Sequence, residues 1–395
     1  MDAALRTQLE LDSCLKRVSR AARVLPGLTA KHGPKERGRL VGALESGNVD
    51  ALGPRFSSES QTIKRAVWHD LEEARRLSHD ALAGQLYRDR LDELELELML
   101  IEALGHPKRV RPLAARRFGD GGALIEAAQR ILDIPDEDTS SADPDEVPAE
   151  GTRSLASILR SVAKAAGIDI KVQVEPKLVS SAAAGERTVF ISPRPIDARE
   201  AHRLAVHEVL GHLIAAANGR AQKLALFRVG TATAFADQEG LALHLEAESG
   251  LMDARRVRTI AARVWVTKKM HEGASFRDVV LTLYGELGFS AVDCVTLGER
   301  AFRGGGIARD ASYLRGWRRV RRSIQSGEGS LNELRCGRVS ARDMPTLRAL
   351  REGGLACEPT YQPSLSRSLA ATGWGTSSWT SPPSLAASLM ILDET

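Results

Sequence analysis

The chain has 395 residues, of which 43% are apolar and 27% are charged, and its formal net charge is +4. This composition is ordinary for a soluble globular protein with more than one core, and the mild positive charge does not by itself indicate nucleic-acid binding. No apolar run reaches the length of a membrane span, and the N-terminus lacks the apolar segment of a signal peptide. We therefore expect a cytoplasmic protein without a membrane partner.

Cysteine usage argues against two further classes of protein. The four cysteines are scattered singly, without a CxxC pair, at positions 14, 294, 336 and 357. Neither a disulfide framework nor a cysteine zinc site is expected from such spacing, and we expect reduced thiols.

The first third of the chain has the pattern of a helical region. Residues 1–132 are rich in helix formers, and the strongest segment is Leu91 to Leu104. No motif in this region carries chemistry, so we expect helices that pack on a catalytic core. Residues 133–150 are acidic and interrupted by prolines, which favours a solvated linker or insertion over an intramolecular decoy for a basic groove.

Two short segments before residue 200 alternate apolar and polar residues. Ile168 to Val174 and Thr188 to Ser192 have the period of β-strands, and Gly185 lies in the loop between them. We predict that they pair antiparallel in a small sheet. Val189 to Ser192 is expected at the sheet edge, where an extended peptide can add as a further strand.

The segment 201–220 has apolar residues on nearly every face of a helix, which predicts a buried helix. His207, Glu208 and His212 lie within it. Burying two imidazoles and a carboxylate costs several kcal/mol, about 1–3 for each unpaired polar group, unless each finds a partner or a metal. The cluster therefore indicates a functional site.

The spacing of the histidines is unusual. In His-Glu-x-x-x-His a regular α-helix places the second imidazole about 140° from the first, too far for one metal ion. One wide turn with an i→i+5 hydrogen bond brings the two side chains into phase, and such turns tend to occur at functional sites. We predict a π-type bulge between Val209 and His212, with Gly211 as the residue that deforms most easily.

A third ligand is expected from a second apolar helix. Glu239 is the best candidate, and Gly240 beside it would let this helix approach the first one closely. Two histidines and one glutamate leave a fourth position for water, as in a catalytic zinc site. Glu208 is then free to act as general base.

The segment 300–322 interleaves arginines with Phe302, Tyr313 and Trp317. Such a pattern can bind nucleic acid, but a solvated helical face is the simpler interpretation for residues 315–322. If the metal site is correct, a third interpretation is better: a guanidinium group binds a substrate carboxylate. The candidate substrate-binding residues are Arg300, Arg303 and Arg309. The tail, residues 359–395, is rich in Ser, Pro, Thr and Gly, and we expect it to wrap the surface or to be disordered.

The motifs HEVLGH and QEGLA together resemble the QEGLA-motif family, which includes the microtubule-associated tyrosine carboxypeptidases. Further blocks of the chain resemble the family in the same order, over roughly residues 150–358: 218–222, 273–276, 303–310 and 313–316. The resemblance implies that His207, His212 and Glu239 are metal ligands and that Glu208 is the catalytic glutamate. The chain departs from the family pattern at Arg309, where lysine is usual, and at 215–217, where alanines replace frequent aromatics.

Taken together, the sequence predicts an α+β, mostly helical protein with a zincin-like metallopeptidase core at 151–358. The predicted function is that of a zinc metallocarboxypeptidase with one Zn²⁺ per chain and a peptide or protein C-terminus as substrate. Tyr313 is the expected oxyanion donor, and His244 is a reserve donor, a group that supports a metal ligand or an ordinary buried polar group. The competing hypotheses are a non-catalytic binding protein that retains the zinc fold and a nucleic-acid binder that uses residues 300–322.

Overall fold

The computed structural model describes residues 3–24, 28, 33–56, 58–81, 83–135, 146–373 and 383–394. The protein is mostly helical with two small sheets, as the sequence predicts. Residues 136–145 of the expected acidic linker and 374–382 of the expected tail lie outside the described residues. No helix in the described part of the chain is both long and apolar enough to cross a membrane.

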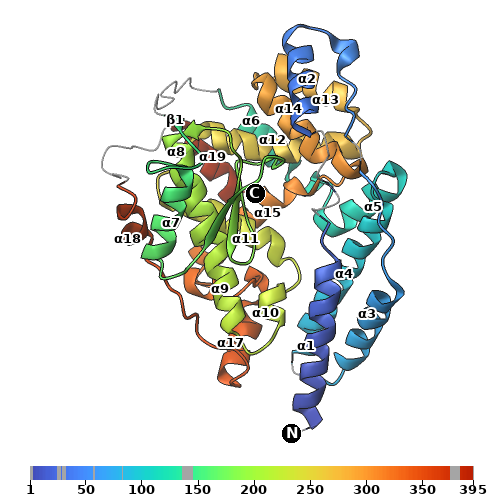
Figure 1. Ribbon diagram of the computed structural model, residues 1–395, viewed down its shortest axis with the longest axis vertical. Coiled ribbons are helices and arrows are strands. Elements are labelled where there is room, and N and C mark those ends of the chain that lie inside the picture. Colours follow the sequence, from blue (N-terminus) through green and yellow to red (C-terminus); the bar gives the residue numbers. More distant parts are fainter. Residues whose placement is uncertain are drawn as a thin grey trace.

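Helices α1, α3, α4 and α5 pack side by side along one flank of the molecule, whereas α2 packs on α14 (Ala291–Phe302) and α6 packs on α12 (Ala254–His271) (Figure 1). Their apolar residues recur at helical spacing, and Leu11, Leu15 and Val18 of the first helix are fully buried. The elements are α1 (Ala3–Ala21), α2 (Gly33–Glu45), η2 (Val49–Ala51), α3 (Arg65–Leu77), α4 (Gly84–Ala103), α5 (Pro107–Phe118), η3 (Gly122–Leu124) and α6 (Ile125–Leu132). One apolar cluster joins α1, α3 and α4 to the helices of the second half, so the two halves share a core.

The sheets differ in pairing from the prediction. One is a two-stranded ribbon of β1 (Glu146–Val147) and β5 (Ile196–Asp197). The other has the order β2-β4-β3, where β2 is Lys171–Val174, β3 is Ala182–Ala184 and β4 is Thr188–Ile191.

The prediction that the two alternating segments pair antiparallel is wrong, because β2 and β4 are parallel. The connection between them contains β3, which pairs antiparallel with β4 and makes β4 the central strand. The prediction that Val189 to Ser192 lies at the sheet edge is therefore also wrong. The edge strands are β2 and β3. The alanine run of β3 has no alternating pattern, so the sequence did not reveal this strand.

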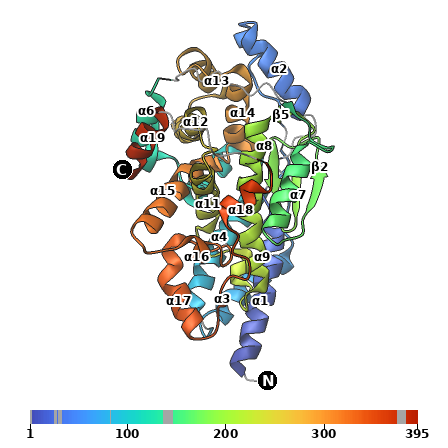
Figure 2. The ribbon, with the colours of Figure 1, turned by 90° about the vertical axis from the view of Figure 1, so that its left-hand side faces the viewer.

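The second half is built around α11 (Ala234–Glu248), which lies between η4 (Val206–Leu213) and α15 (Ser312–Gln325) (Figure 2). The other elements are α7 (Leu155–Ala165), α8 (Ala198–Ala205), α9 (Ile214–Ala221), α10 (Leu226–Val229), α12 (Ala254–His271), α13 (Phe276–Gly285), α14 (Ala291–Phe302), η5 (Arg303–Gly305), η6 (Arg309–Ala311), α16 (Leu331–Leu334), η7 (Ala341–Asp343), α17 (Met344–Glu352), α18 (Leu365–Ala370) and α19 (Pro383–Glu394).

Small residues let α11 approach both neighbours. A Cβ atom at Gly211 of η4 would lie 2.7 Å from the Cβ atom of Ala242. Gly240 was expected to face the helix with the two histidines, but it faces α15. A Cβ atom there would lie 2.1 Å from the carbonyl carbon of Gly316 in α15. Neither space can hold a side chain, so glycine at these positions sets the distance of α11 from η4 and α15.

Candidate metal centre

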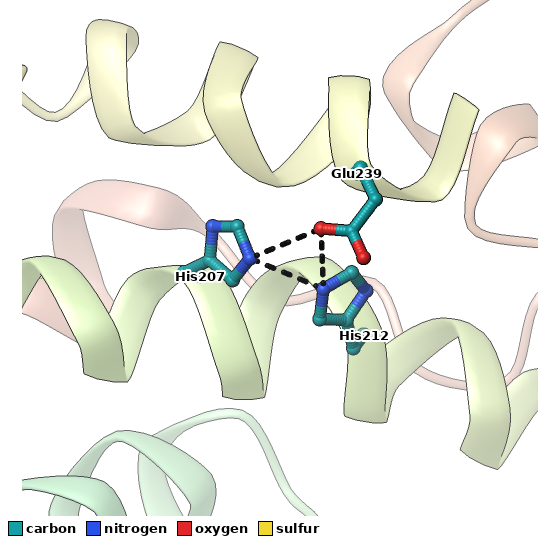
Figure 3. Close-up of side chains that lie close together, drawn as sticks. All are labelled: His207, His212 and Glu239. Atoms are coloured by element: carbon teal, nitrogen blue, oxygen red, sulfur yellow. Dashed lines mark hydrogen bonds and ion pairs between the residues drawn. The ribbon is translucent and has the colours of Figure 1, made fainter. Parts of the chain in front are cut away.

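The helix that carries the two histidines winds as a π-helix over Val206–Leu213, between α8 and α9. The predicted wide turn is confirmed and extends over the whole motif. Figure 3 shows His207 and His212 projecting from this helix toward Glu239, which comes from α11. Both imidazoles therefore share one face, although five residues separate them.

Three ligand atoms converge at this point. The Nε2 atoms of His207 and His212 are 3.2 Å apart, and they lie 3.5 and 3.6 Å from Oε2 of Glu239. Three ligands that each lie about 2.0–2.2 Å from one tetrahedral zinc ion are about 3.3–3.6 Å from one another. Among the described residues, these three form the group of His, Cys, Asp and Glu side chains with metal-ligand spacing.

One ligand atom of this cluster has no hydrogen bond to a described residue. Oε2 of Glu239 is buried and has no hydrogen-bond partner among the described residues. A buried carboxylate oxygen without a partner is costly, and a cation between it and the two imidazoles would satisfy it. The donor set of two imidazoles and one carboxylate therefore fits zinc.

His207 is held from its other side by Glu246, a residue that the sequence analysis did not single out. Oε1 of Glu246 lies 2.6 Å from Nδ1 of His207, while Arg203 and Arg256 also donate to the Glu246 carboxylate. Glu246 follows Glu239 by two helical turns, so both point from the same face of α11. This spacing is the signal from which Glu246 could have been found.

The charges around the imidazoles favour a cation. Burial lowers the pKa of His207, but Glu239, Glu246 and Glu208 outweigh it and raise this pKa to about 9. Burial raises the pKa of Glu239, yet His212 and His207 hold it well below its usual range. The carboxylates around His207 thus favour positive charge at this point, which a metal ion would supply.

Glu208 and Tyr313 border the same cleft, whose volume is about 1880 Å³. Glu208 is buried and lines the cleft, and no hydrogen bond or ion pair joins its carboxylate to another described residue. Burial and the nearby Glu239 raise the pKa of Tyr313 to about 12, which keeps its hydroxyl a hydrogen-bond donor. The cleft is lined by the residues that follow α1, by residues of α4 and α5, and by residues of β3, η4, α11 and α12.

The three predicted substrate arginines line this cleft but differ in their partners. Arg300 is paired with Asp310, so its charge is already balanced. Arg303 is buried, and its Nε atom has no hydrogen-bond partner among the described residues; the same holds for Nε of Arg309, whose guanidinium group lies 5.1 Å from the ring centre of Phe235. Arg303 and Arg309 are therefore better placed than Arg300 to bind an anion.

Arg263 of α12 joins this cluster, although no sequence motif marked it. Its guanidinium group lies 4.6 Å from the ring centre of Tyr313, and its Nε and Nη1 atoms have no hydrogen-bond partner in the described chain. Burial lowers the pKa of Arg263 and of Arg303 to about 10, and neighbouring guanidinium groups add to the effect. Both groups remain charged at neutral pH and are available to bind an anion.

A scan against protein-family models matches residues 54–377 to the family described as microtubule-associated tyrosine carboxypeptidase. The chain belongs to this family. No curated protein and no solved structure matches it. The matched region starts well upstream of residue 150, so the family unit includes α3 to α6 as well as the helices around the candidate metal centre.

Two further predictions for this member of the carboxypeptidase family concern His244 and the aromatic residues of 300–322. His244 is absent from the cleft lining, and the charged groups that act on it are Glu248, Arg321 and Arg335. The hydrogen bond that supports the candidate ligand His207 comes from Glu246 and not from His244. Tyr313 and Trp317 are buried and Phe302 is half-buried, so residues 300–322 do not present the exposed rings on which nucleic-acid bases stack.

Proposed function

We propose that this protein is a zinc-dependent carboxypeptidase that removes residues from the C-terminus of a peptide or protein. The observation that carries the proposal is the convergence of His207, His212 and Glu239 at metal-ligand spacing in a cleft that Glu208 also lines. Membership of a carboxypeptidase family supports the same reaction class.

The chemistry follows from the donor set. When bound by these three residues, zinc would act as a Lewis acid toward the scissile carbonyl and would lower the pKa of a water molecule. Glu208 takes the proton from the attacking water and then delivers it to the leaving amine. Its carboxylate can do both because no protein partner occupies it.

Tyr313 is the proposed donor to the oxyanion that forms on the scissile carbonyl. Its hydroxyl stays protonated at neutral pH, since burial and Glu239 both raise its pKa. A neutral donor aimed at developing negative charge stabilises the transition state more than the ground state.

The arginines would give the enzyme its preference for a chain end. An internal peptide segment carries no main-chain carboxylate, whereas a C-terminus does, and Arg263, Arg303 and Arg309 offer unpartnered N–H groups in the cleft. β3 is an edge strand whose residues line the cleft, so the peptide before the scissile bond can add to it as a strand.

The test is mass spectrometry of a mixed peptide library incubated with zinc-loaded protein, beside Glu208→Gln as the matched control. We expect stepwise loss of C-terminal residues with the wild type alone, and the spectra identify the residue removed; tyrosine is the first to examine, given the family description. Internal cuts would refute the arginine contact with the chain end. Intact peptides in both reactions, with zinc bound to both proteins, would favour a binding protein instead.

A further inference from the structure

His207 lies between two carboxylates of one helix. Its Nε2 atom faces Oε2 of Glu239 at 3.5 Å, and its Nδ1 atom lies 2.6 Å from Oε1 of Glu246. The two glutamates are seven residues apart in α11, two turns and thus about 10 Å along the axis. The imidazole is therefore held by a hydrogen bond at Nδ1, while Nε2 faces the candidate metal position.

The contact with Glu246 sets the tautomer of the imidazole. A carboxylate accepts and cannot donate, so the proton of neutral His207 must be on Nδ1, and the lone pair must be on Nε2. A metal ligand needs its lone pair on that atom. His212 differs: its contacts with Glu239 and His207 are both made by Nε2, and no contact of its Nδ1 atom with a described carboxylate or carbonyl oxygen is found.

Glu246 is itself held in a fixed position. It is completely buried and accepts from Nη1 of Arg203 at 3.0 Å, and from Nε and Nη2 of Arg256 at 3.0 and 3.1 Å. The two arginines come from α8 and α12, so Glu246 is tied to a helix on either side of α11. A buried carboxylate with two guanidinium partners stays charged and cannot swing away from the imidazole.

We propose that Glu246 is a positioning residue for the metal centre, which fixes His207 in the tautomer and orientation that bind zinc through Nε2. This inference rests on the proposed zinc site. A histidine ligand whose other nitrogen loses its carboxylate partner typically weakens metal affinity 10- to 100-fold. The contacts of the Glu246 carboxylate among the described residues are with His207, Arg203 and Arg256, and none joins it to Glu208 or Tyr313.

The test measures the zinc dissociation constant of the full chain by competition with a chromophoric chelator. In Glu246→Gln the constant should rise about 10- to 100-fold. Glu97→Gln is the matched control, because Glu97 is also a buried acceptor of two arginines, Arg90 and Arg117, but touches no metal ligand. It should bind zinc as the wild type does, although it loses a comparable set of ion pairs.

A second variant separates the imidazole contact from the ion pairs. Glu246→Asp keeps the charge for Arg203 and Arg256 but withdraws the carboxylate from His207 by one methylene, so it should fold and still bind zinc more weakly. The visible spectrum of the Co²⁺-loaded protein should change in both Glu246 variants and not in Glu97→Gln. Unchanged zinc affinity in Glu246→Asp, or an equal loss in Glu97→Gln, would overturn the inference. Absence of zinc binding by the wild type would overturn the metal centre itself, and with it this inference.

Discussion

The cleft contains two charged clusters of opposite sign. Around His207, three carboxylates converge, and the unpartnered atom is an oxygen, Oε2 of Glu239. Around Tyr313, the guanidinium groups of Arg263 and Arg300 lie near the ring with Asp310 as their carboxylate, and the unpartnered atoms are nitrogens. The first cluster is short of a cation, and the second is short of an anion.

This difference indicates how the two clusters divide the reaction. A site with surplus negative charge favours a metal ion, and a site with surplus positive charge favours a carboxylate, so we propose that the first cluster binds zinc and the second binds the substrate C-terminus. The predictions below change the balance of one cluster at a time. Changes to the first cluster should impair metal binding and turnover. Changes to the second should impair substrate binding.

The largest effect is expected from Glu239→Gln. The amide removes the anionic ligand, so the protein should lose zinc on dialysis and lose peptidase turnover with it. Zinc content by elemental mass spectrometry and turnover of a C-terminal peptide are the two measurements. Full zinc content after the substitution would show that Glu239 is not a ligand.

Glu208→Gln should keep the metal and lose the proton transfer. We expect kcat to fall by about 10²–10⁴-fold, because general acid–base catalysis contributes this much. Zinc content should match that of the wild type. Turnover within threefold of the wild type would contradict the assignment of Glu208 as base.

Asp310→Asn disturbs the basic cluster without touching the metal. Arg300 would lose its buried carboxylate, which costs about 3–5 kcal/mol in the free energy of unfolding. Denaturant unfolding of the metal-free protein measures this loss, and zinc affinity should not change. A loss below about 1 kcal/mol would mean that the cluster is balanced by another group.

Arg303→Ala and Arg309→Ala should weaken the recognition of the chain end. Losing a charged hydrogen bond costs about 1.5–3 kcal/mol, so kcat/KM should fall about 10- to 100-fold for a peptide with a free C-terminus. The same peptide with an amidated C-terminus serves as the control, because it offers these arginines no carboxylate. Unchanged turnover in both variants would remove the carboxylate contact from the mechanism.

The smallest effect concerns pH. Burial raises the pKa of Asp310, but Arg300 and Arg263 outweigh it and hold the pKa at about 2, below its ordinary value of 3.8. A depressed carboxyl pKa stabilises the fold above the ordinary value and loses this contribution as pH falls through the folded value, here from about 4 to about 2. The stability difference between wild type and Asp310→Asn should therefore shrink by about 2 kcal/mol over that range, as followed by denaturant unfolding.

The sequence predicted the part of the metal site that local geometry determines. The interval between His207 and His212 required a wide turn, because only that turn puts both imidazoles on one face, and η4 provides it. Glu239 was proposed as the third ligand because it lies in a second apolar helix, α11, beside a glycine. These inferences need only the rotation per residue of a helix.

The features that the sequence did not reveal depend on contacts between distant segments. Arg263 lies in a helix without a motif, and its importance comes from packing against Tyr313, fifty residues later. The strand β3 consists of alanines and pairs with β4 through its backbone, so no side-chain pattern marks it. Gly240 faces α15 and not η4, which only the packing of three helices determines.

The central claim is that His207, His212 and Glu239 hold one zinc ion. Anomalous diffraction from a zinc-loaded crystal at the zinc absorption edge tests it most directly. The account predicts a single peak about 2.0–2.2 Å from Nε2 of both histidines and from a carboxylate oxygen of Glu239. A crystal of zinc-binding protein with no peak there, or with its peak at other residues, would contradict it.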